Sequence, residues 1–530
     1  MILTPQQLGL SQWRPGQYQA IQNSRNSKKR FVGQCAPTGT GKTAIMLGEA
    51  LESGARTLIL TATKALQKQY VEEHPNLNIL SVQGKANYTC NAMLVGGEFY
   101  DGSPARSVAE APCQLGEECG LRNSGCTYYD TIASAKYYKR VCSNYAAYIS
   151  ANLYTEGWGK FDLILADECH EMEMWLSKML AVNFPRCYTN LAGGRLPNST
   201  NVATWVAWAA RELPMIKAAI RIEKRVLAKA RRKKYAHLRV LQQAESNLSK
   251  MTTMTHEWRV FPGQSHILFQ PIWVHEYTEP LVFNGANKVV CASSTMVPNT
   301  LSLMGISDSE MDFFSYPSQF PVSRRPIHYY PVARMRHGMP ESEIQQCVDA
   351  IDSFISMRLD RKGFIPTPSF ALQNLILKNS RFSSLMIANS QSGTSTQGSN
   401  TSLSSMTLQR FKASPTPFIL LGPSWNTGID LPGKLCNYTI IPKMFMPDIT
   451  DPLLVARTED HPDYAWHHAG TIFTQAIGRA MRSSTDLNEV FVTDATFGKF
   501  MSQHRRMIAD WVWPAVQFVT TVPTPTKELI

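Results

Sequence analysis

The sequence has no apolar run close to the roughly 18 residues that a membrane-spanning helix requires. Its first residues are not a charged segment followed by an apolar core. We therefore expect a cytoplasmic protein with no signal peptide and no transmembrane segment. No solenoid-type internal repeat is present, so a repeat architecture is not expected. None of the eleven cysteines belongs to a C-x-x-C pair, the spacing typical of zinc ribbons.

Length and charge give the first positive expectations. The 530 residues are too many for one hydrophobic core, and with 44% apolar residues they predict two or three globular domains. The 53 basic and 41 acidic side chains leave a net charge of +12, which favours a polyanionic partner, although many soluble proteins are equally basic without one. In a reducing compartment, the cysteines predict metal ligands, cluster ligands or buried thiols rather than disulfides.

A phosphate-binding loop is predicted at "CAPTGTGKT", between an expected strand in "KRFVGQ" and an expected helix in "AIMLGEALESGA". The segment fits A/G-x-x-x-x-G-K-S/T, in which backbone N–H groups and a helix N-terminus face the phosphates. Lys42 would reach the β and γ oxygens, and Thr43 would bind Mg²⁺. The predicted nucleotide-contacting residues of the loop are Ala36, Pro37, Thr38, Gly39, Thr40, Gly41, Lys42 and Thr43.

Two carboxylates follow an apolar strand in "KFDLILADECH". Alone, such a pair fits a solvated loop equally well, but beside a phosphate-binding loop it indicates a Mg²⁺ and hydrolysis site. Asp167 would hold Mg²⁺, directly or through water, and Glu168 would orient and deprotonate the attacking water. We expect His170 to couple motifs rather than bind metal, because no second histidine lies at ligand spacing.

A third motif lies in "QAIGRAMRS". Arg479 and Arg482 are separated by one helical turn, so a helix would present both on one face. Together with Gln475, they could meet a γ-phosphate bound on another domain and act as arginine fingers. Two arginines on a helix are usually just solvated, so this interpretation depends on the other motifs.

The order "WRPGQYQAIQ", "APTGTGKT", "TATKALQKQY", "DECH", "CASSTM", "WNTGIDLPG", "QAIGRAMR" resembles the superfamily 2 helicases, and specifically the iron-sulfur DNA helicases of the DinG/XPD type. The resemblance runs from about Trp13 to Asp494. It implies an α/β fold of two RecA-like parallel-sheet motor domains, with an iron-sulfur cluster insertion and a helical arch insertion in the first. It also implies ATP, Mg²⁺ and a 4Fe–4S cluster as cofactors.

The resemblance assigns further nucleotide-binding residues. Gln17 resembles the adenine-reading glutamine of the family, and Arg14 stands beside it. In "PSWNTGIDLPG", Gly428 and Asp430 match the motif of the second motor domain that contributes to nucleotide binding. Thr427 departs from the family, which usually carries glutamate there.

Other residues are expected to contact DNA or to couple DNA binding to the ATP state. Thr61 and Thr63 match a motif that touches the DNA backbone, and Ser293 and Thr295 match one that links the ATP state to the grip on DNA. A basic helical segment between Lys217 and Arg239 resembles the arch. It could guide single-stranded DNA through phosphate contacts, although a solvated helix face is the simpler reading. Its candidate contacts are Arg231, Arg232 and Lys233.

Four cysteines lie where the family holds its cluster, namely Cys90, Cys113, Cys119 and Cys126. The words "KANYTC" and "GCTYYD" resemble the flanks of the family's cluster ligands. Thiolates suit an iron-sulfur cluster or zinc, so spacing alone leaves a cluster, zinc and free thiols open. The resemblance favours the cluster.

The chain is expected to divide at the insertions. The first motor domain comprises residues 1–89, 127–170 and 259–310, the cluster domain residues 90–126, the arch residues 171–258 and the second motor domain residues 311–530. We expect a monomeric ATP-dependent DNA helicase that moves along single-stranded DNA and unwinds forked duplexes, 5′ to 3′ by resemblance. The alternatives are a translocase without unwinding and a redox-responsive nucleic-acid-binding module. The sequence leaves replication, repair and defence open as pathways.

Overall fold

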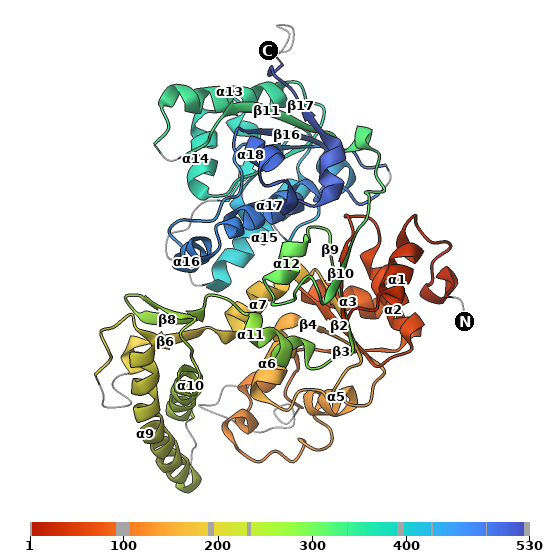
Figure 1. Cartoon of the computed structure of the whole chain (residues 1–530). Coiled ribbons are helices and arrows are strands. Elements are labelled where there is room, and N and C mark those ends of the chain that lie inside the picture. Colours follow the sequence, from red (N-terminus) through yellow and green to blue (C-terminus); the bar gives the residue numbers. More distant parts are fainter. Residues whose placement is uncertain are drawn as a thin grey trace.

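The computed structural model describes residues 3–91, 107–188, 195–230, 235–336, 338–389, 397–425, 428–483 and 485–523. In these ranges the chain forms two seven-stranded parallel sheets, each covered by helices, and one small antiparallel sheet. Figure 1 shows the two parallel-sheet units stacked end to end, with the N-terminal unit in the middle and the C-terminal unit above it. The prediction of two parallel-sheet α/β domains is confirmed.

The first sheet has the strand order β10-β1-β9-β5-β2-β4-β3, and every neighbouring pair is parallel. Its strands are β1 (Phe31–Cys35), β2 (Thr57–Thr61), β3 (Ile79–Val82), β4 (Arg140–Asn144), β5 (Leu163–Asp167), β9 (Lys288–Ser293) and β10 (Met311–Ser315). Its main helices are α1 (Gln17–Asn26), α2 (Lys42–Ser53), α3 (Lys64–Glu72), α6 (Tyr145–Tyr154), α7 (Met172–Leu180), α11 (His275–Thr278) and α12 (Pro298–Ser302). Because β10 pairs with β1, the first sheet extends past the expected domain boundary at residue 310.

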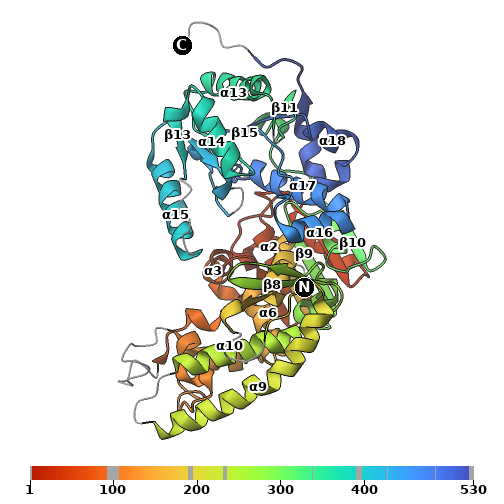
Figure 2. The same cartoon turned by 90° about the vertical axis from the view of Figure 1, so that its left-hand side faces the viewer.

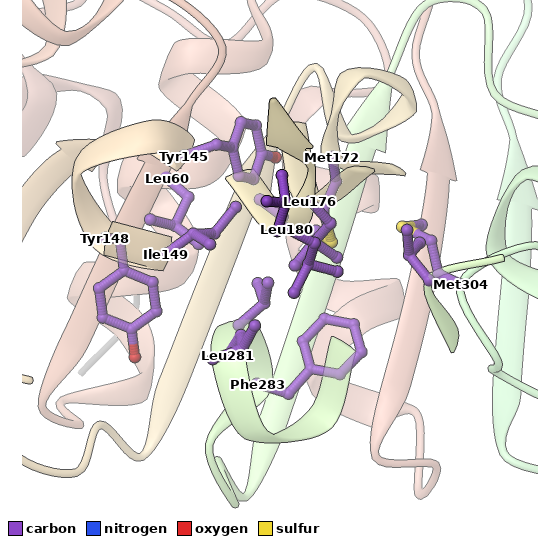
Figure 3. Close-up of a cluster of buried hydrophobic side chains, with 14 of the residues drawn as sticks. Leu60, Tyr145, Tyr148, Ile149, Met172, Leu176, Leu180, Leu281, Phe283 and Met304 are labelled. Carbon is purple, nitrogen blue, oxygen red and sulfur yellow. The ribbon is translucent and has the colours of Figure 1, made fainter. Parts of the chain in front are cut away.

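Both faces of the first sheet are buried, which explains why its strands read as continuous apolar runs. Side chains alternate along the strands: Ile59 and Leu165 enter a core with α2 and α3, whereas Leu60 and Ile164 enter a second core with α6 and α7. Figure 3 shows part of this second core, where side chains of α6, α7 and the π-helical turn η8 (Glu279–Phe283) gather beside the sheet.

The second sheet has the strand order β13-β14-β12-β15-β16-β11-β17 and is also parallel throughout. Its strands are β11 (Ile327–Ala333), β12 (Gly363–Pro366), β13 (Met386–Ala388), β14 (Ile419–Gly422), β15 (Tyr438–Ile441), β16 (Glu489–Asp494) and β17 (Val516–Phe518). The helices are α13 (Glu341–Ser356), α14 (Phe370–Asn379), α15 (Gln397–Ala413), α16 (Pro452–Asp460), α17 (Asp463–Ile477) and α18 (Phe497–Ser502).

The segment expected as an arch contains two long helices, α9 (Val202–Lys229) and α10 (Ala236–Met251). They pack on a three-stranded antiparallel sheet of β6 (Val182–Pro185), β8 (His266–Pro271) and β7 (Trp258–Pro262) through the aromatic side chains of Phe184, Trp205, Trp208 and Phe269. Strands β7 and β8 extend this unit beyond residue 258. Arg231, Arg232 and Lys233 lie outside the described residues.

The arch touches the cysteine-bearing segment, which contains η3 (Lys85–Asn87), η4 (Val108–Glu110), η5 (Pro112–Leu115) and α5 (Thr127–Ala135). Leu115 packs against Leu227 and Leu238, and the Gln242 amide donates to the Leu115 carbonyl at 3.4 Å. Figure 2 shows α9 and α10 running alongside each other toward this segment. Among the described residues, no helix is both long and apolar enough to cross a membrane.

Candidate ATP-binding site and cysteine group

Three predicted motifs follow neighbouring strands of the first sheet. Strand β9 lies between β1 and β5, and its register pairs Ser293 with Cys35 and Ala292 with Asp167. Carboxyl ends of parallel strands meet at one edge of a sheet, where ligands of such folds bind. The fold therefore brings the phosphate-binding loop, the Asp-Glu pair and "CASSTM" to one edge.

The phosphate-binding loop joins β1 to α2, which begins at Lys42. Gly39 and Gly41 have φ values of 84° and 75°, in the left-handed region that favours glycine. At Gly39 a side chain would also collide with the ring of Phe320, from the segment between the two motor domains. The loop conformation thus leaves the N-terminus of α2 facing the cleft, as phosphate binding requires.

Arg14 and Gln17 support this loop from the N-terminal segment. The Arg14 guanidinium donates to the Gly39 carbonyl at 2.6 Å, and the Gln17 amide donates to the Thr40 carbonyl at 2.8 Å. The Gln17 side-chain oxygen accepts from the Arg14 N–H at 2.8 Å, and Gln17 is buried. Both side chains line the cleft and also fix the loop's backbone.

Asp167 is the last residue of strand β5, and Glu168 follows it. Asp167 is buried, and its Oδ1 accepts from the Glu168 N–H at 2.9 Å. Glu168 has φ 49°, an uncommon conformation for a residue with a side chain, and forms an ion pair with Lys42 at 3.2 Å. Together with Thr43, Asp167 offers the oxygen ligands that Mg²⁺ prefers, and both residues line the cleft. These donors fit a Mg²⁺ site.

The two carboxyl groups titrate differently. Burial, and then the charge of Glu168, raise the pKa of Asp167 to about 6. Burial alone would raise the pKa of Glu168, but the adjacent Lys42 charge, followed by His170, lowers it to about 2. Glu168 is therefore ionised throughout the physiological range, as an acceptor for the proton of an attacking water must be.

A chain of hydrogen bonds connects Glu168 to the second motor domain. Ser293 Oγ donates to Glu168 Oε2 at 3.3 Å and lies 2.7 Å from His170 Nδ1. His170 Nε2 contacts the Gln475 side-chain amide on α17. Burial lowers the pKa of His170, so the ring is neutral at pH 7 and can donate at one nitrogen and accept at the other. Thr295 Oγ1 lies 3.1 Å from Ser293 Oγ, inside the same network.

The two arginines lie at the end of α17. Arg479 donates to the Ile429 carbonyl at 3.0 Å, whereas Arg482 is paired with Asp430. Gly428 precedes this segment with φ 79°. Asn426 and Thr427, the position that departs from the family, lie outside the described residues.

A cleft of about 490 Å³ lies between the two motor domains and is lined by residues of both. Its predicted lining residues are Arg14, Gln17, Thr38, Gly39, Gly41, Lys42, Thr43, Asp167, Glu168, Asp430 and Arg482. The other residues predicted for this site do not line the cleft, namely Ala36, Pro37, Thr40, Gly428, Gln475 and Arg479. Sequence reasoning missed Gln69, Glu73 and His74, which line the cleft from the C-terminal end of α3. The sequence could have indicated these residues, because α3 follows β2, a strand that neighbours β5.

The two threonines expected at DNA differ in position. Thr61 is completely buried, and its hydroxyl donates to the carbonyls of Thr63 and Ser143 at 3.1 and 3.3 Å. Its side chain therefore shapes the loop from inside. Thr63 is exposed and caps α3 through a hydrogen bond from the Leu66 N–H, which leaves it on the surface.

Three of the four predicted cysteines lie in one group. Cys90, Cys113 and Cys126 pack together with Val108 and Ala111. Within the part of the chain that the structure describes, Cys119 is half-buried and lies outside this group. The Gln114 amide donates to the Cys113 sulfur at 3.4 Å. The role of the four cysteines as cluster ligands stays a prediction.

Comparisons with known proteins agree with this geometry. A model of the helicase C-terminal domain matches residues 360–515, and a model of the type III restriction enzyme res subunit matches residues 10–184. An XPD helicase structure is 16% identical with a TM-score of 0.60, and the match covers 98% of this chain and 100% of that chain. The chain therefore carries a helicase C-terminal domain in residues 360–515, and its fold is that of the XPD helicase structure. No curated protein sequence matches it significantly.

Two more solved structures share this fold. The apo form of an XPD protein is 15% identical with a TM-score of 0.56, and Xpd4 of S. tokodaii is 13% identical with a TM-score of 0.56. Each match covers 96% of this chain and 100% of the other. At these identities the solved structures show the fold, and the helicase C-terminal domain model matches the second parallel-sheet unit. The predicted family is therefore confirmed.

Proposed function

We propose that the protein is an ATP-dependent DNA helicase that moves along single-stranded DNA, 5′ to 3′, and unwinds duplex DNA. The observation that carries this proposal is the composite cleft. Lys42 and Glu168 enter it from the first motor domain, and Asp430 and Arg482 enter it from the second. A phosphate chain bound there would touch both domains, so its hydrolysis would change how they are held together.

In the proposed reaction, Lys42 and the N-terminus of α2 bind the phosphates, and Thr43 and Asp167 hold Mg²⁺. When bound, Mg²⁺ neutralises charge on the phosphates. Glu168 orients the attacking water and takes its proton. Its ion pair with Lys42 must therefore loosen when the γ-phosphate arrives, because Lys42 then has a second anionic partner.

Coupling to movement would use the second motor domain. Arg479 and Arg482 stabilise the charge that develops at the γ-phosphate, as arginine fingers do. Gln475, His170 and Ser293 connect α17 to Glu168, so a change at the γ-phosphate reaches both domains. Repeated closing and opening of the cleft would then move the DNA-contacting surfaces, among them Thr63 and the basic arch segment, along the strand.

A 4Fe–4S cluster on Cys90, Cys113, Cys119 and Cys126 is part of the proposal. The grouping of three of these thiols and the contact of the segment with the arch support it. A cluster would fix the loops between these cysteines, where the apolar core is small. The cluster segment and the arch would together form the wedge that separates the strands.

The Glu168→Gln variant tests hydrolysis and unwinding together. We expect it to bind ATP normally but to hydrolyse it about 1,000-fold more slowly, because general-base catalysis typically contributes 10²–10⁴-fold. It should also fail to separate a forked duplex. ATP hydrolysis and strand separation are measured on forked DNA and on single-stranded DNA. Wild-type hydrolysis stimulated by single strands without strand separation would identify a translocase instead. Cellular activity that survives this variant would favour the redox-responsive binding module.

The Cys90→Ser variant tests the cluster. We expect wild-type protein purified without oxygen to contain about four iron and four sulfide per chain, and the variant to lose most of both. The control is Cys187→Ser, which changes an exposed thiol elsewhere and should keep the iron. Zinc, or no metal, in the wild type would contradict the cluster and leave the ATPase untouched.

A further inference from the structure

Tyr70 places a phenol hydroxyl deep under the ATP-binding site. It lies on α3 and is completely buried, in the core that α2 and α3 form against the first sheet. The ring packs among apolar side chains, which a phenylalanine would serve equally well. The hydroxyl donates to Asp167 Oδ2 at 2.8 Å, and this hydrogen bond satisfies a polar group that would be costly to bury alone.

Two other hydrogen bonds hold Asp167. Its Oδ1 accepts from the Glu168 N–H, and its backbone carbonyl accepts from the Tyr145 hydroxyl at 3.0 Å. Tyr145 belongs to the core on the opposite face of the sheet, where Figure 3 shows it among the side chains of α6 and α7. Of the two tyrosines, only Tyr70 reaches the carboxylate itself. The direction of that carboxylate therefore depends on Tyr70.

Tyr70 contacts Asp167, one of the two residues proposed to hold Mg²⁺, although it lies outside the cleft lining. One turn earlier, the Gln67 side-chain amide ties α3 to the sheet by donating to the carbonyls of Val82 and Cys142 at 2.9 and 3.1 Å. Hydrogen bonds to ligands from behind commonly set their orientation, and their loss typically lowers metal affinity or activity by about 10–100-fold.

We propose that Tyr70 is a positioning residue for Mg²⁺-ATP, which orients the Asp167 carboxylate from beneath the cleft. The inference rests on the proposed function, because it assigns Tyr70 to the metal site of that reaction. Helix α3 begins at the exposed Thr63, so the residue also connects the metal site to the surface expected to face DNA.

The test compares Tyr70→Phe with Tyr145→Phe. Each variant removes one buried hydroxyl and keeps the ring. The Tyr70 hydroxyl binds the Asp167 carboxylate, whereas the Tyr145 hydroxyl binds the Asp167 backbone carbonyl. Mn²⁺ serves as the probe, and its binding to the protein–ADP complex is measured by electron paramagnetic resonance. ADP binding in EDTA, thermal unfolding and the Mg²⁺ dependence of ATP hydrolysis are measured beside it.

We expect Tyr70→Phe to weaken Mn²⁺ binding about tenfold and to raise the Mg²⁺ concentration for half-maximal hydrolysis by a similar factor. ADP binding in EDTA should stay within twofold, and Tyr145→Phe should leave Mn²⁺ affinity within twofold. Unchanged Mn²⁺ affinity in Tyr70→Phe, or an equal loss in both variants, would overturn the role of Tyr70 while the wild type remained an ATPase. A wild type without metal-dependent hydrolysis would overturn the proposed function, and this inference with it.

Discussion

Two of the contacts between the motor domains differ in chemistry. At the cleft, the polar partners are partly open to water: the side chains of Glu168, Arg482 and Asp430 are 27%, 34% and 56% exposed. At the second contact, the Arg457 side chain is only 4% exposed and is paired with Glu173 of α7. We call this second contact the Arg457 joint, and it comprises Glu173, Trp273, Arg457, Asp460 and Tyr464.

The polar side chains of the Arg457 joint make several hydrogen bonds. Arg457 Nε donates to the Ile272 carbonyl at 2.7 Å and Nη1 donates to the Tyr464 hydroxyl at 3.0 Å, while the Trp273 indole donates to Asp460. Exposed polar pairs exchange partners at little cost, whereas a desolvated arginine needs its carboxylate. The comparison therefore predicts that ATP rearranges the cleft while the joint stays closed and acts as the pivot.

The largest expected effect comes from breaking the joint. Glu173→Gln leaves the Arg457 charge buried without its carboxylate, so we expect the free energy of unfolding to fall by about 3 kcal/mol. Urea unfolding and proteolysis between the motor domains measure the loss. The double variant Glu173→Gln/Arg457→Met removes both charges and should regain part of the stability. A single variant as stable as wild type would show that the joint does not hold the domains together.

An intermediate effect is expected from pH. His467 of α17 is buried near the joint, with its Nε2 2.9 Å from the Thr300 hydroxyl of the first motor domain. Burial, and then the neighbouring His468 and His170, lower the pKa of His467 to about 3. Between this value and its ordinary pKa near 6.5, only the unfolded chain binds the proton. Stability is therefore complete above pH 6.5 and falls as the pH decreases.

At pH 5 this proton costs up to about 2 kcal/mol of unfolding free energy, because one pKa unit corresponds to about 1.4 kcal/mol. Urea unfolding of wild type and His467→Gln at pH 7 and pH 5 separates this contribution from that of other groups. The variant should lose less stability than wild type between the two pH values. An equal loss in both proteins would show that His467 titrates normally in the folded state.

Much of the cleft could be predicted because its motifs are local and its topology is regular. Lys42 and Asp167 each follow an apolar strand directly, and parallel strands that carry such motifs end at one edge of a sheet. The contact from Tyr70 to Asp167 spans 97 positions and depends on how α3 packs, which no local pattern contains. The burial of Thr61 could not be predicted either, because the motif gives the position of this residue in the chain but not the direction of its side chain.

The domain boundary and the arrangement of the cysteines are two further features that the sequence alone could not predict. Strand β10 follows "CASSTM" after an intervening helix, so the sequence pattern alone does not tell which sheet it joins. The cysteine group forms between turns and 3-10 helices, where no strand register fixes the distances between sulfurs. Its residues could be found from the resemblance, whereas their arrangement needed the fold. The Arg457 joint had no sequence signal at all, because a single arginine on an amphipathic helix is ordinarily a surface residue.

The smallest effect is expected from a substitution at the cleft, for comparison with the substitution at the Arg457 joint. Asp430→Asn removes the partner of Arg482, but because both side chains are accessible to water, we expect the free energy of unfolding to change by less than about 0.5 kcal/mol. The same urea assay measures it, with Glu173→Gln as the matched change of one carboxylate in the buried contact. A loss as large as that of Glu173→Gln would mean that the cleft also holds the domains together without nucleotide. Opening the cleft would then break a stable contact in every round of ATP hydrolysis, and the Arg457 joint would not be the only contact that holds the two motor domains together.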